Sequence, residues 1–339
     1  MNLTIQQIAD ELGISKTTVH RALTGTGRIS AQTKQRVLDL AEKLDYTPNS
    51  IAQSLRSKRS MTVGLILRGI MVGHYYSEIL AGIEEVATNA GYVINIACSS
   101  DDSETEATII QNFCRRQVDG IIIAPVENSF PGNYKLLQQH NIPFVFIDKY
   151  IEDIPADVVT ADSATGVKRA VHYLHTNGRN RIAFLNGFER NSVTIQQRLK
   201  GYREQLLADH KDYQLVIESD YFGKEDTLCG YSAMCHALQR LSPGERMDAL
   251  ICVNDSLAFG ALKAIREFGL RVPEDIAVIG NNNDSMAEYV YPMLTTLSQP
   301  KQDMGRLAMR LLLHHLTDKE DTQYGFYSFP VSLLIRNST

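Results

Sequence analysis

The sequence of 339 residues lacks the features of membrane and secreted proteins. No run approaches the about eighteen consecutive apolar residues that a transmembrane helix needs. The N-terminus, MNLTIQQIADELG, carries acids and amides where a signal peptide has basic residues followed by an apolar run. We therefore expect a cytoplasmic protein without a membrane partner.

Cysteine is scarce, and the common catalytic motifs are missing. The five cysteines are scattered without a Cys-x-x-Cys pair or a histidine at ligand spacing, so we expect reduced thiols, no metal site and no cofactor. The sequence contains neither a nucleotide-binding glycine-rich loop nor the Gly-x-Ser-x-Gly and His-Glu-x-x-His motifs of hydrolases. These absences favour a protein that is not an enzyme.

Length and charge divide the chain into a small basic head and a larger acidic body. At about 150 residues per domain, the length predicts two domains and a smaller addition. Residues 1–60, the head, carry nine Lys and Arg against five acids, whereas residues 61–339, the body, carry 25 against 34. This asymmetry indicates that the head binds a polyanion.

Residues 1–47 have the pattern of three short helices. Thr4 and Gln7 have the spacing of a capping box, and Gly13 ends the first helix before Ser15 caps the second. A third helix begins after Ser30. Two short helices joined by a glycine-containing turn and closed by a third are typical of a helix-turn-helix domain. A plain three-helix bundle with a solvated basic face is the alternative.

The second of these helices is short and basic, as a helix that enters the major groove of DNA must be. Its predicted base contacts are Lys16, Thr17 and Arg21. Helix N-termini offer hydroxyls and free backbone N–H groups to phosphate oxygens. The predicted contacts to the DNA backbone are accordingly Thr4, Ser15, Thr18, His20, Ser30, Thr33 and Asn49.

Residues 48–60 form a predicted hinge and linker between the helix-turn-helix domain and the body. Pro48 separates this segment from the third helix, and its apolar residues fall on one side of one or two helical turns. Such a helix is too short to be stable alone in water. An apolar residue beside the small Ala52 suits a wedge that opens a base step in the minor groove. An unstructured basic linker is the alternative.

The body, residues 61–339, alternates short apolar runs with helical stretches. Runs buried on both faces and spaced by helices indicate parallel sheets built from βαβ units. Two sets of four runs predict two doubly wound lobes: residues 63–67, 93–96, 120–123 and 144–147, then 181–185, 215–217, 249–252 and 276–279. Ligands bind such folds outside the carboxyl ends of the strands, so we expect an effector site in a cleft between the lobes.

Polar side chains follow several of these runs. Asp148 comes just after residues 144–147, and Asp162 comes after a further short run at residues 158–161. Asn254 and Asp255 follow residues 250–253, and residues 281–283 are three asparagines that follow the last run. Carboxylates and amides on a cleft, with Arg198 opposite and Tyr75 or Tyr76 to stack, form a set that suits a polyol. Asp162 and Asp255 also precede helices, which leaves open that they are N-caps.

Segments of the head match a known pattern: Thr4-Ile5-Gln6-Gln7-Ile8-Ala9, Gly13-Ile14-Ser15, Thr18-Val19 with Arg21, Tyr46-Thr47-Pro48-Asn49 and Ile51-Ala52-Gln53-Ser54-Leu55. By these segments the head resembles the DNA-binding head of the lac/gal repressor family of bacterial transcription regulators. The resemblance implies that Lys16, Thr17 and Arg21 contact bases. It also implies that Leu55 is the hinge wedge, with Ala52 and Arg56 beside it in the minor groove.

The body continues this resemblance to its C-terminus and is more distantly similar to periplasmic sugar-binding proteins. Matching segments include Val118–Ile122, Asn254–Gly260 and Val272–Ile276. Where the family typically reads Gly-Phe-Asp-Asp, this chain reads Gly280-Asn281-Asn282-Asn283, which leaves open a more anionic or differently hydroxylated ligand. The resemblance implies effector contacts at Tyr75, Asp148, Thr194, Arg198, Phe222, Asn254 and Asn282.

The expected fold class is thus α/β, with a small all-α head followed by a two-lobed, periplasmic-binding-protein-like domain. The resemblance implies a homodimer that binds a palindromic DNA operator and represses genes of carbohydrate or related metabolism under control of a sugar-like effector. Two alternatives remain: a cytoplasmic carbohydrate-processing enzyme that uses Asp148 with Asp162 or His74 as acid and base, and a sugar-binding receptor.

Overall fold

The computed structural model describes residues 4–25, 27–46, 59–69, 75–127, 129–187, 192–219, 226–242, 244–318 and 323–339. Its contacts divide the chain into two compact units, residues 1–60 and 61–339. The further division of the head into a helix-turn-helix domain and a hinge stays a prediction. Within the described residues, no helix has both the length and the apolarity needed to cross a bilayer.

Three helices form the head, and each begins at a side-chain cap that the sequence predicts. Thr4 Oγ1 accepts from Gln7 N and Gln7 Oε1 accepts from Thr4 N, so the capping box is complete. Ser15 and Ser30 each accept from the backbone N–H three residues later. The helices are α1 (Ile5–Leu12), α2 (Lys16–Thr24) and α3 (Ala31–Lys43). They enclose a small core of Ile8, Ala9, Val19, Ala22, Val37, Leu40 and Ala41.

The body holds two six-stranded sheets of matching topology. The sheet of lobe 1 has the order β11-β5-β4-β3-β1-β2, and that of lobe 2 has the order β12-β10-β9-β8-β6-β7. Among the described strand pairs, only β10–β12 is antiparallel. The strands are β1 (Thr62–Leu67), β2 (Val93–Cys98), β3 (Gly120–Ile123), β4 (Phe144–Ile147), β5 (Asp157–Ala161), β6 (Ile182–Asn186), β7 (Leu215–Glu218), β8 (Ala249–Cys252), β9 (Ala277–Asn281), β10 (Thr295–Ser298), β11 (Phe326–Phe329) and β12 (Ser332–Leu334).

Helices cover both faces of each sheet, which confirms the doubly wound α/β prediction. In β1, Leu65 packs in one apolar cluster with Ile79 of α5, whereas the next residue, Ile66, packs in another with Phe113 of α6. The helices of lobe 1 are α5 (Tyr75–Asn89), α6 (Ser103–Arg115), α7 (Gly132–Gln139) and α12 (Lys301–Thr317). Those of lobe 2 are α8 (Ser163–Thr176), α9 (Val193–Ala208), α10 (Asp226–Arg240), α11 (Asp255–Glu267) and a short 3-10 helix (Ser285–Glu288).

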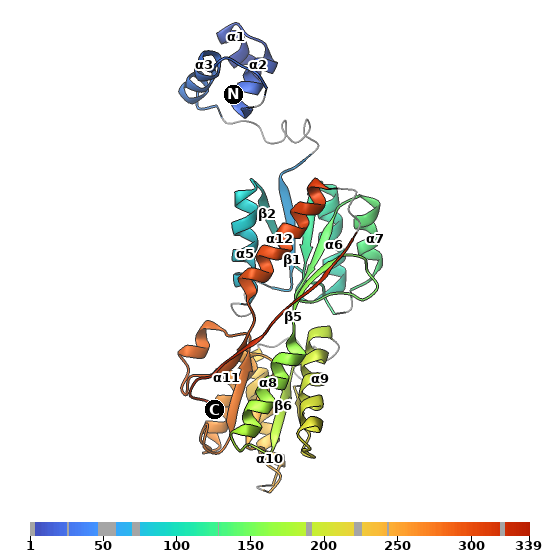
Figure 1. Ribbon diagram of the computed structural model, residues 1–339, viewed down its shortest axis with the longest axis vertical. Coiled ribbons are helices and arrows are strands. Elements are labelled where there is room, and N and C mark those ends of the chain that lie inside the picture. The colour runs from blue at the N-terminus through green and yellow to red at the C-terminus, as the bar shows by residue number, and fades with distance from the viewer. Residues whose placement is uncertain are drawn as a thin grey trace. The chain divides into compact units, whose positions relative to one another are not determined.

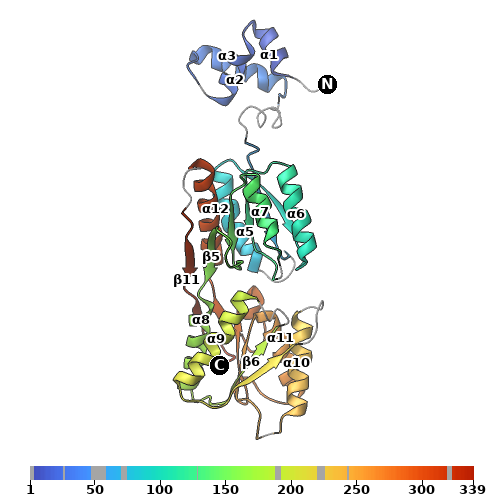
Figure 2. The ribbon, with the colours of Figure 1, turned by 90° about the vertical axis from the view of Figure 1, so that its right-hand side faces the viewer.

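The chain passes between the lobes three times along the described elements. It leaves lobe 1 after β5, returns from β10 into α12, and leaves again between β11 and β12. Figure 1 shows α12, in red, lying across lobe 1 although it follows the last parallel strand of lobe 2. Figure 2 shows β11 continuing from lobe 1 toward lobe 2. Each lobe is therefore assembled from segments far apart in the sequence.

The prediction that every apolar run is buried on both faces is wrong for residues 93–96. This run forms β2, in which the Val93 and Ile96 side chains are 65% and 40% exposed. The physical reason is its position, because β2 lies at the edge of the lobe 1 sheet. The sequence reasoning also missed the short strands β10, β11 and β12.

Helices α5 and α12 pack at backbone distance. A Cβ on Gly82 would lie 2.0 Å from the Gln302 carbonyl oxygen in α12, and a Cβ on Gly305 would lie 2.1 Å from the Ile79 carbonyl oxygen in α5. No side-chain atom fits at either distance. The two glycines therefore allow the crossing that holds the returning helix α12 on lobe 1.

We expect Gly82→Ala to destabilise the body by about 2 kcal/mol or more, because the new methyl group forces two helix backbones apart. Gly244→Ala is the matched control, since a Cβ there meets nothing within 4 Å. Urea unfolding followed by circular dichroism measures both. Equal midpoints for Gly82→Ala and the unsubstituted chain would contradict the backbone contact.

Candidate functional site

The exposed face of α2 carries the predicted base contacts. Lys16, Thr17 and Arg21 are all exposed, and Arg21 lies one turn after Thr17 on the same side of the helix. On the other side, Val19 and Ala22 are buried in the head core. This packing directs a basic, polar surface outward, as contact with a DNA groove requires.

Hydroxyl pairs mark the starts of α2 and α3. The Ser15 and Thr18 hydroxyl oxygens lie 2.9 Å apart, and those of Ser30 and Thr33 lie 2.8 Å apart. Within each pair one hydroxyl proton is shared, so the other is left for a phosphate oxygen. Thr4 is exposed at the start of α1, and His20 is half-buried on α2. The predicted contacts Asn49, Ala52, Leu55 and Arg56 lie outside the described residues.

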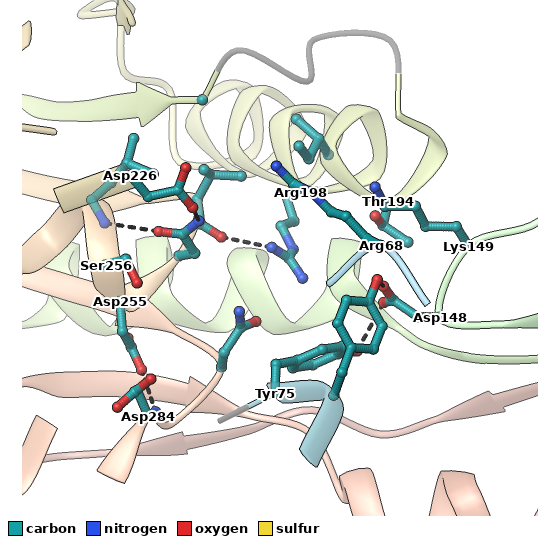
Figure 3. Close-up of a pocket in the computed structure, with 17 residues that line it drawn as sticks. Arg68, Tyr75, Asp148, Lys149, Thr194, Arg198, Asp226, Asp255, Ser256 and Asp284 are labelled. Atoms are coloured by element: carbon teal, nitrogen blue, oxygen red, sulfur yellow. Dashed lines mark hydrogen bonds between the residues drawn. The ribbon is translucent and has the colours of Figure 1, made fainter. Parts of the chain in front are cut away.

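A cavity lies between the carboxyl ends of the two sheets, and Figure 3 shows the side chains that line it. Six of the predicted effector contacts line this cavity: Tyr75, Asp148, Thr194, Arg198, Asn254 and Asn282. The seventh, Phe222, lies outside the described residues, as does His74. The rule that ligand-binding side chains follow the carboxyl ends of strands, the strand-end rule, indicated Asp148, Asn254 and Asn282. The structure brings these residues together with Tyr75, which lies more than two hundred positions before Asn282 in the chain.

Asp148 is held by two tyrosines of α5. Tyr75 Oη donates to Oδ1 at 2.8 Å, and Tyr76 Oη donates to Oδ2 at 2.9 Å. Burial, followed by the nearby Asp148 charge, raises the pKa of both tyrosines well above the usual value, so they stay neutral donors. Asp148 itself has a φ of 66°. Each carboxylate oxygen keeps a further lone pair with which to accept a ligand hydroxyl.

Arg198 of α9 faces Asp148 from lobe 2 (Figure 3). Its Nη1 donates to the Val253 carbonyl oxygen at 2.6 Å, while its Nε is buried with no hydrogen-bond partner. Desolvation by burial lowers the pKa of this guanidinium, although arginine remains protonated. A buried donor without a partner typically costs about 1–3 kcal/mol. A ligand oxygen that accepted from Nε would remove this cost.

Asn254 is largely committed to holding α11. Its Oδ1 accepts from Leu257 N at 2.8 Å as the N-cap, and its Nδ2 donates to Asp226 Oδ2 at 2.9 Å. The asparagine thus orients Asp226, which sequence reasoning missed and which also lines the cavity. Asn254 also lines the cavity, and its amide has one N–H left for a ligand.

Asp255 is not the N-cap of α11, which is one of the two roles that the sequence allowed. Its buried carboxylate instead accepts two hydrogen bonds from other segments of lobe 2. Its Oδ1 accepts from Thr296 Oγ1 and its Oδ2 accepts from Asp284 N, both at 2.6 Å. Desolvation raises its pKa to about 6. Asp162, by contrast, is the N-cap of α8 and accepts from Thr165 N at 3.1 Å. Asp162 is not among the described residues that line the cavity.

Only one of the three consecutive asparagines lines the cavity. Asn281 ends β9 and accepts from Gln299 Nε2 at 2.8 Å, and Asn283 accepts from Arg336 Nη2 at 2.9 Å. Asn282 lies between them with a φ of 111° and lines the cavity. The departure from the family pattern therefore changes one cavity residue, not three.

Several polar lining residues were missed by the sequence reasoning. Lys149 and Asp284 directly follow predicted residues, so extending the strand-end rule by one position finds both. Burial lowers the pKa of Lys149. Asp226 lies eight residues beyond the end of β7, too far for that rule to indicate it. The missed residues are Arg68, Lys149, Asp226, Ser256 and Asp284, whereas Tyr76 was expected as an alternative to Tyr75.

Two family models match the chain. The model of bacterial regulatory proteins of the lacI family matches residues 4–49, and the model of a periplasmic binding protein-like domain matches residues 171–339. Catabolite control protein A of Priestia megaterium is 30% identical over 342 aligned positions, which cover 100% of both chains.

Solved structures show the same likeness. The lac repressor dimer bound to operator and the anti-inducer ONPF has a TM-score of 0.86 at 26% identity, covering 100% of this chain and 99% of that one. The complex of the transcriptional regulator CelR with cellobiose has a TM-score of 0.75 at 27% identity, covering 99% and 100%.

We expect the raised pKa of Asp255 to make the body less stable as the pH rises from about 4 through 6. Over this range the unfolded carboxyl ionises before the folded one, which corresponds to about 3 kcal/mol lost above pH 6. Asp255→Asn removes this titration, so the stability of the variant relative to the unsubstituted chain should improve between pH 4.5 and 7.5. Urea unfolding at the two pH values measures it; an unchanged difference would show that Asp255 does not titrate there.

Proposed function

Because the chain belongs to the lacI family of bacterial regulatory proteins, we propose that it is a transcriptional repressor that binds a palindromic operator as a homodimer under control of a small effector. One observation carries this proposal: the chain combines an exposed basic helix with a cavity in which the Nε of the buried Arg198 lacks a hydrogen-bond partner. The helix suits DNA, and the cavity suits a small molecule. The similar lac repressor structure holds both kinds of partner.

In the head, we assign base reading to Lys16, Thr17 and Arg21. Arginine and lysine in the major groove favour guanine, whose O6 and N7 both accept hydrogen bonds. The hydroxyls at the starts of the helices fix the register on the duplex by contacting phosphates. We assign the minor-groove contact to Ala52, Leu55 and Arg56, because an apolar residue beside the small Ala52 suits a wedge at a base step.

In the body, we assign the cavity to a polyhydroxylated, sugar-like metabolite. Each hydroxyl of such a ligand both donates and accepts, and the cavity offers both partners. Asp148 and Asp226 accept, whereas Arg198 donates. The CelR structure, which resembles this chain, contains cellobiose.

Effector binding acts on DNA binding through the lobes. A ligand that contacts Asp148 from lobe 1 and Arg198 from lobe 2 stabilises one separation of the lobes over others. A coupling of about 1–3 kcal/mol changes operator affinity about 5- to 150-fold. This range is enough to switch a regulated promoter.

We further propose that the chain catalyses no reaction and acts in the cytoplasm, where its operator DNA is. The enzyme alternative required Asp148 to act with Asp162 or His74. Asp148 instead accepts from two tyrosines, and Asp162 caps α8. The similar solved structures include the lac repressor and the transcriptional regulator CelR. A receptor role would leave the basic head without a ligand.

We expect Arg21→Ala to weaken binding to the preferred operator by about 10- to 100-fold, because a bidentate contact to guanine is lost. The same substitution should have little effect on an operator in which that guanine is replaced. Fluorescence anisotropy at one salt concentration measures the affinity of both proteins for both operators, the preferred operator being selected from genomic fragments. Leu55→Ala is the contrasting variant and should weaken all operators alike. Uniform weakening by Arg21→Ala would make Arg21 a phosphate contact.

We expect Arg198→Met to abolish the response of operator binding to its effector while the ligand-free protein still binds DNA. The reason is the loss of the buried donor, Arg198 Nε, that is left for a ligand in the cavity. Operator titrations across a panel of sugars and sugar phosphates first identify the effector and whether it releases or promotes binding. Arg203→Met, an exposed position on the same helix, is the control. An unchanged response in Arg198→Met would remove the cavity as the effector site.

A further inference from the structure

Lys301 is a buried lysine at the point where the chain returns from lobe 2 to lobe 1. It is the first residue of α12 and is 3% exposed. A cation at a helix N-terminus opposes the helix dipole, and burial of an ammonium adds a desolvation cost. Helix formation and packing therefore both disfavour a lysine here. Its contacts supply the compensation.

The ammonium group contacts both lobes. Toward lobe 2, Lys301 Nζ donates to the Asn282 carbonyl oxygen at 2.7 Å and to that of Asn283 at 3.4 Å. Toward lobe 1, it forms an ion pair of 2.5 Å with Glu78 Oε1 of α5. An ammonium has three N–H donors, and these three partners account for them. Lys301 is thus a polar bridge between the end of β9 and the start of α5.

Both ends of this bridge adjoin the walls of the cavity. Asn282 lines the cavity from lobe 2, and its φ of 111° lies where side chains are rarely tolerated, so its conformation needs support. Tyr75 lines the cavity from lobe 1, one helical turn before Glu78, and its ring centroid lies 5.9 Å from Lys301 Nζ. Lys301 therefore adjoins one lining residue from each lobe, Asn282 from lobe 2 and Tyr75 from lobe 1.

We propose that Lys301 is a positioning residue that ties the loop of Asn282 to α5 and thereby sets the separation of the two cavity walls. Pulling Glu78 away from the Asn282 carbonyl would leave a buried charge short of a partner, which resists opening of the lobes at this point. The inference rests on the proposed function only in treating the cavity as the effector site. The bridge itself is a property of the ligand-free chain.

Hydrogen–deuterium exchange of the full-length, ligand-free protein, resolved to single residues by fragmentation, tests the bridge. The reporters are the amides of Asn282 and Asn283, which donate to Leu297 O at 2.8 Å and to Thr296 Oγ1 at 3.2 Å. We expect Lys301→Met to speed their exchange about tenfold or more, since the carbonyl support is lost.

Arg306→Met is the matched control. Arg306 lies on the same helix and pairs with Glu85 of α5 at 2.9 Å, but both partners belong to lobe 1. This variant removes a cation from the α5–α12 contact without touching lobe 2, so exchange at Asn282 and Asn283 should stay unchanged. Equal exchange at these amides in Lys301→Met and Arg306→Met would overturn the proposal.

Glu78→Gln provides the second, cross-lobe test. Glu78 contacts Lys301 but neither reporter amide, so faster exchange at Asn282 in this variant requires transmission from lobe 1 through the ammonium. Unchanged exchange at Asn282 would overturn the proposal that Lys301 links the loop of Asn282 to α5. Glu78→Gln tests this proposal even if Lys301→Met does not fold. Because no DNA or ligand is used, a failure of operator binding in separate titrations would count against the proposed function alone.

Discussion

The shared direction of the strands determines where this molecule can hold a ligand. In a parallel sheet all carboxyl ends meet at one edge, and the two sheets of the body have the same strand order. Asp148 and Asn282 follow β4 and β9, which occupy equivalent positions in the two orders. Both residues have positive φ, 66° and 111°. The same tight turn out of the sheet thus presents one polar side chain from each lobe to the common cavity.

The cavity is already organised without a ligand, because Asp148, Arg198 and Asp226 each have a partner in the protein and retain capacity for another. Asp148 accepts from two tyrosines, Arg198 donates to a carbonyl, and Asp226 accepts from Asn254. These bonds fix the orientation of the charged groups before binding, which reduces the entropy lost when a ligand arrives. Asn282 replaces a carboxylate of the family pattern, yet Asp284, two residues on, also lines the cavity. A carboxylate thus lines the cavity two residues after Asn282.

Local rules explain how much of this could be predicted from the sequence. The helix starts at Thr4, Ser15 and Ser30 depend on residues three positions apart, so their caps are visible in the sequence. The strand-end rule found Asp148 and Asn254 for a similar reason, because each lies within two residues of the end of a strand that is visible in the sequence. It could not decide which of three asparagines faces the cavity, because that depends on where β9 ends. Lys301 was invisible because its partners, Glu78 and Asn282, come from two lobes and meet it only through the long return of the chain.

That return has a consequence for synthesis on the ribosome. Helix α12 covers β3, β4 and β5, and Leu312 packs in one cluster with Val145 and Ile147. These strands leave the exit tunnel long before residues 301–317 are translated, and chains elongate at about 5–20 residues per second. The nascent lobe 1 therefore exposes an apolar sheet face for several seconds while lobe 2 is made. Until α12 emerges, this exposed apolar face makes the nascent chain prone to aggregation.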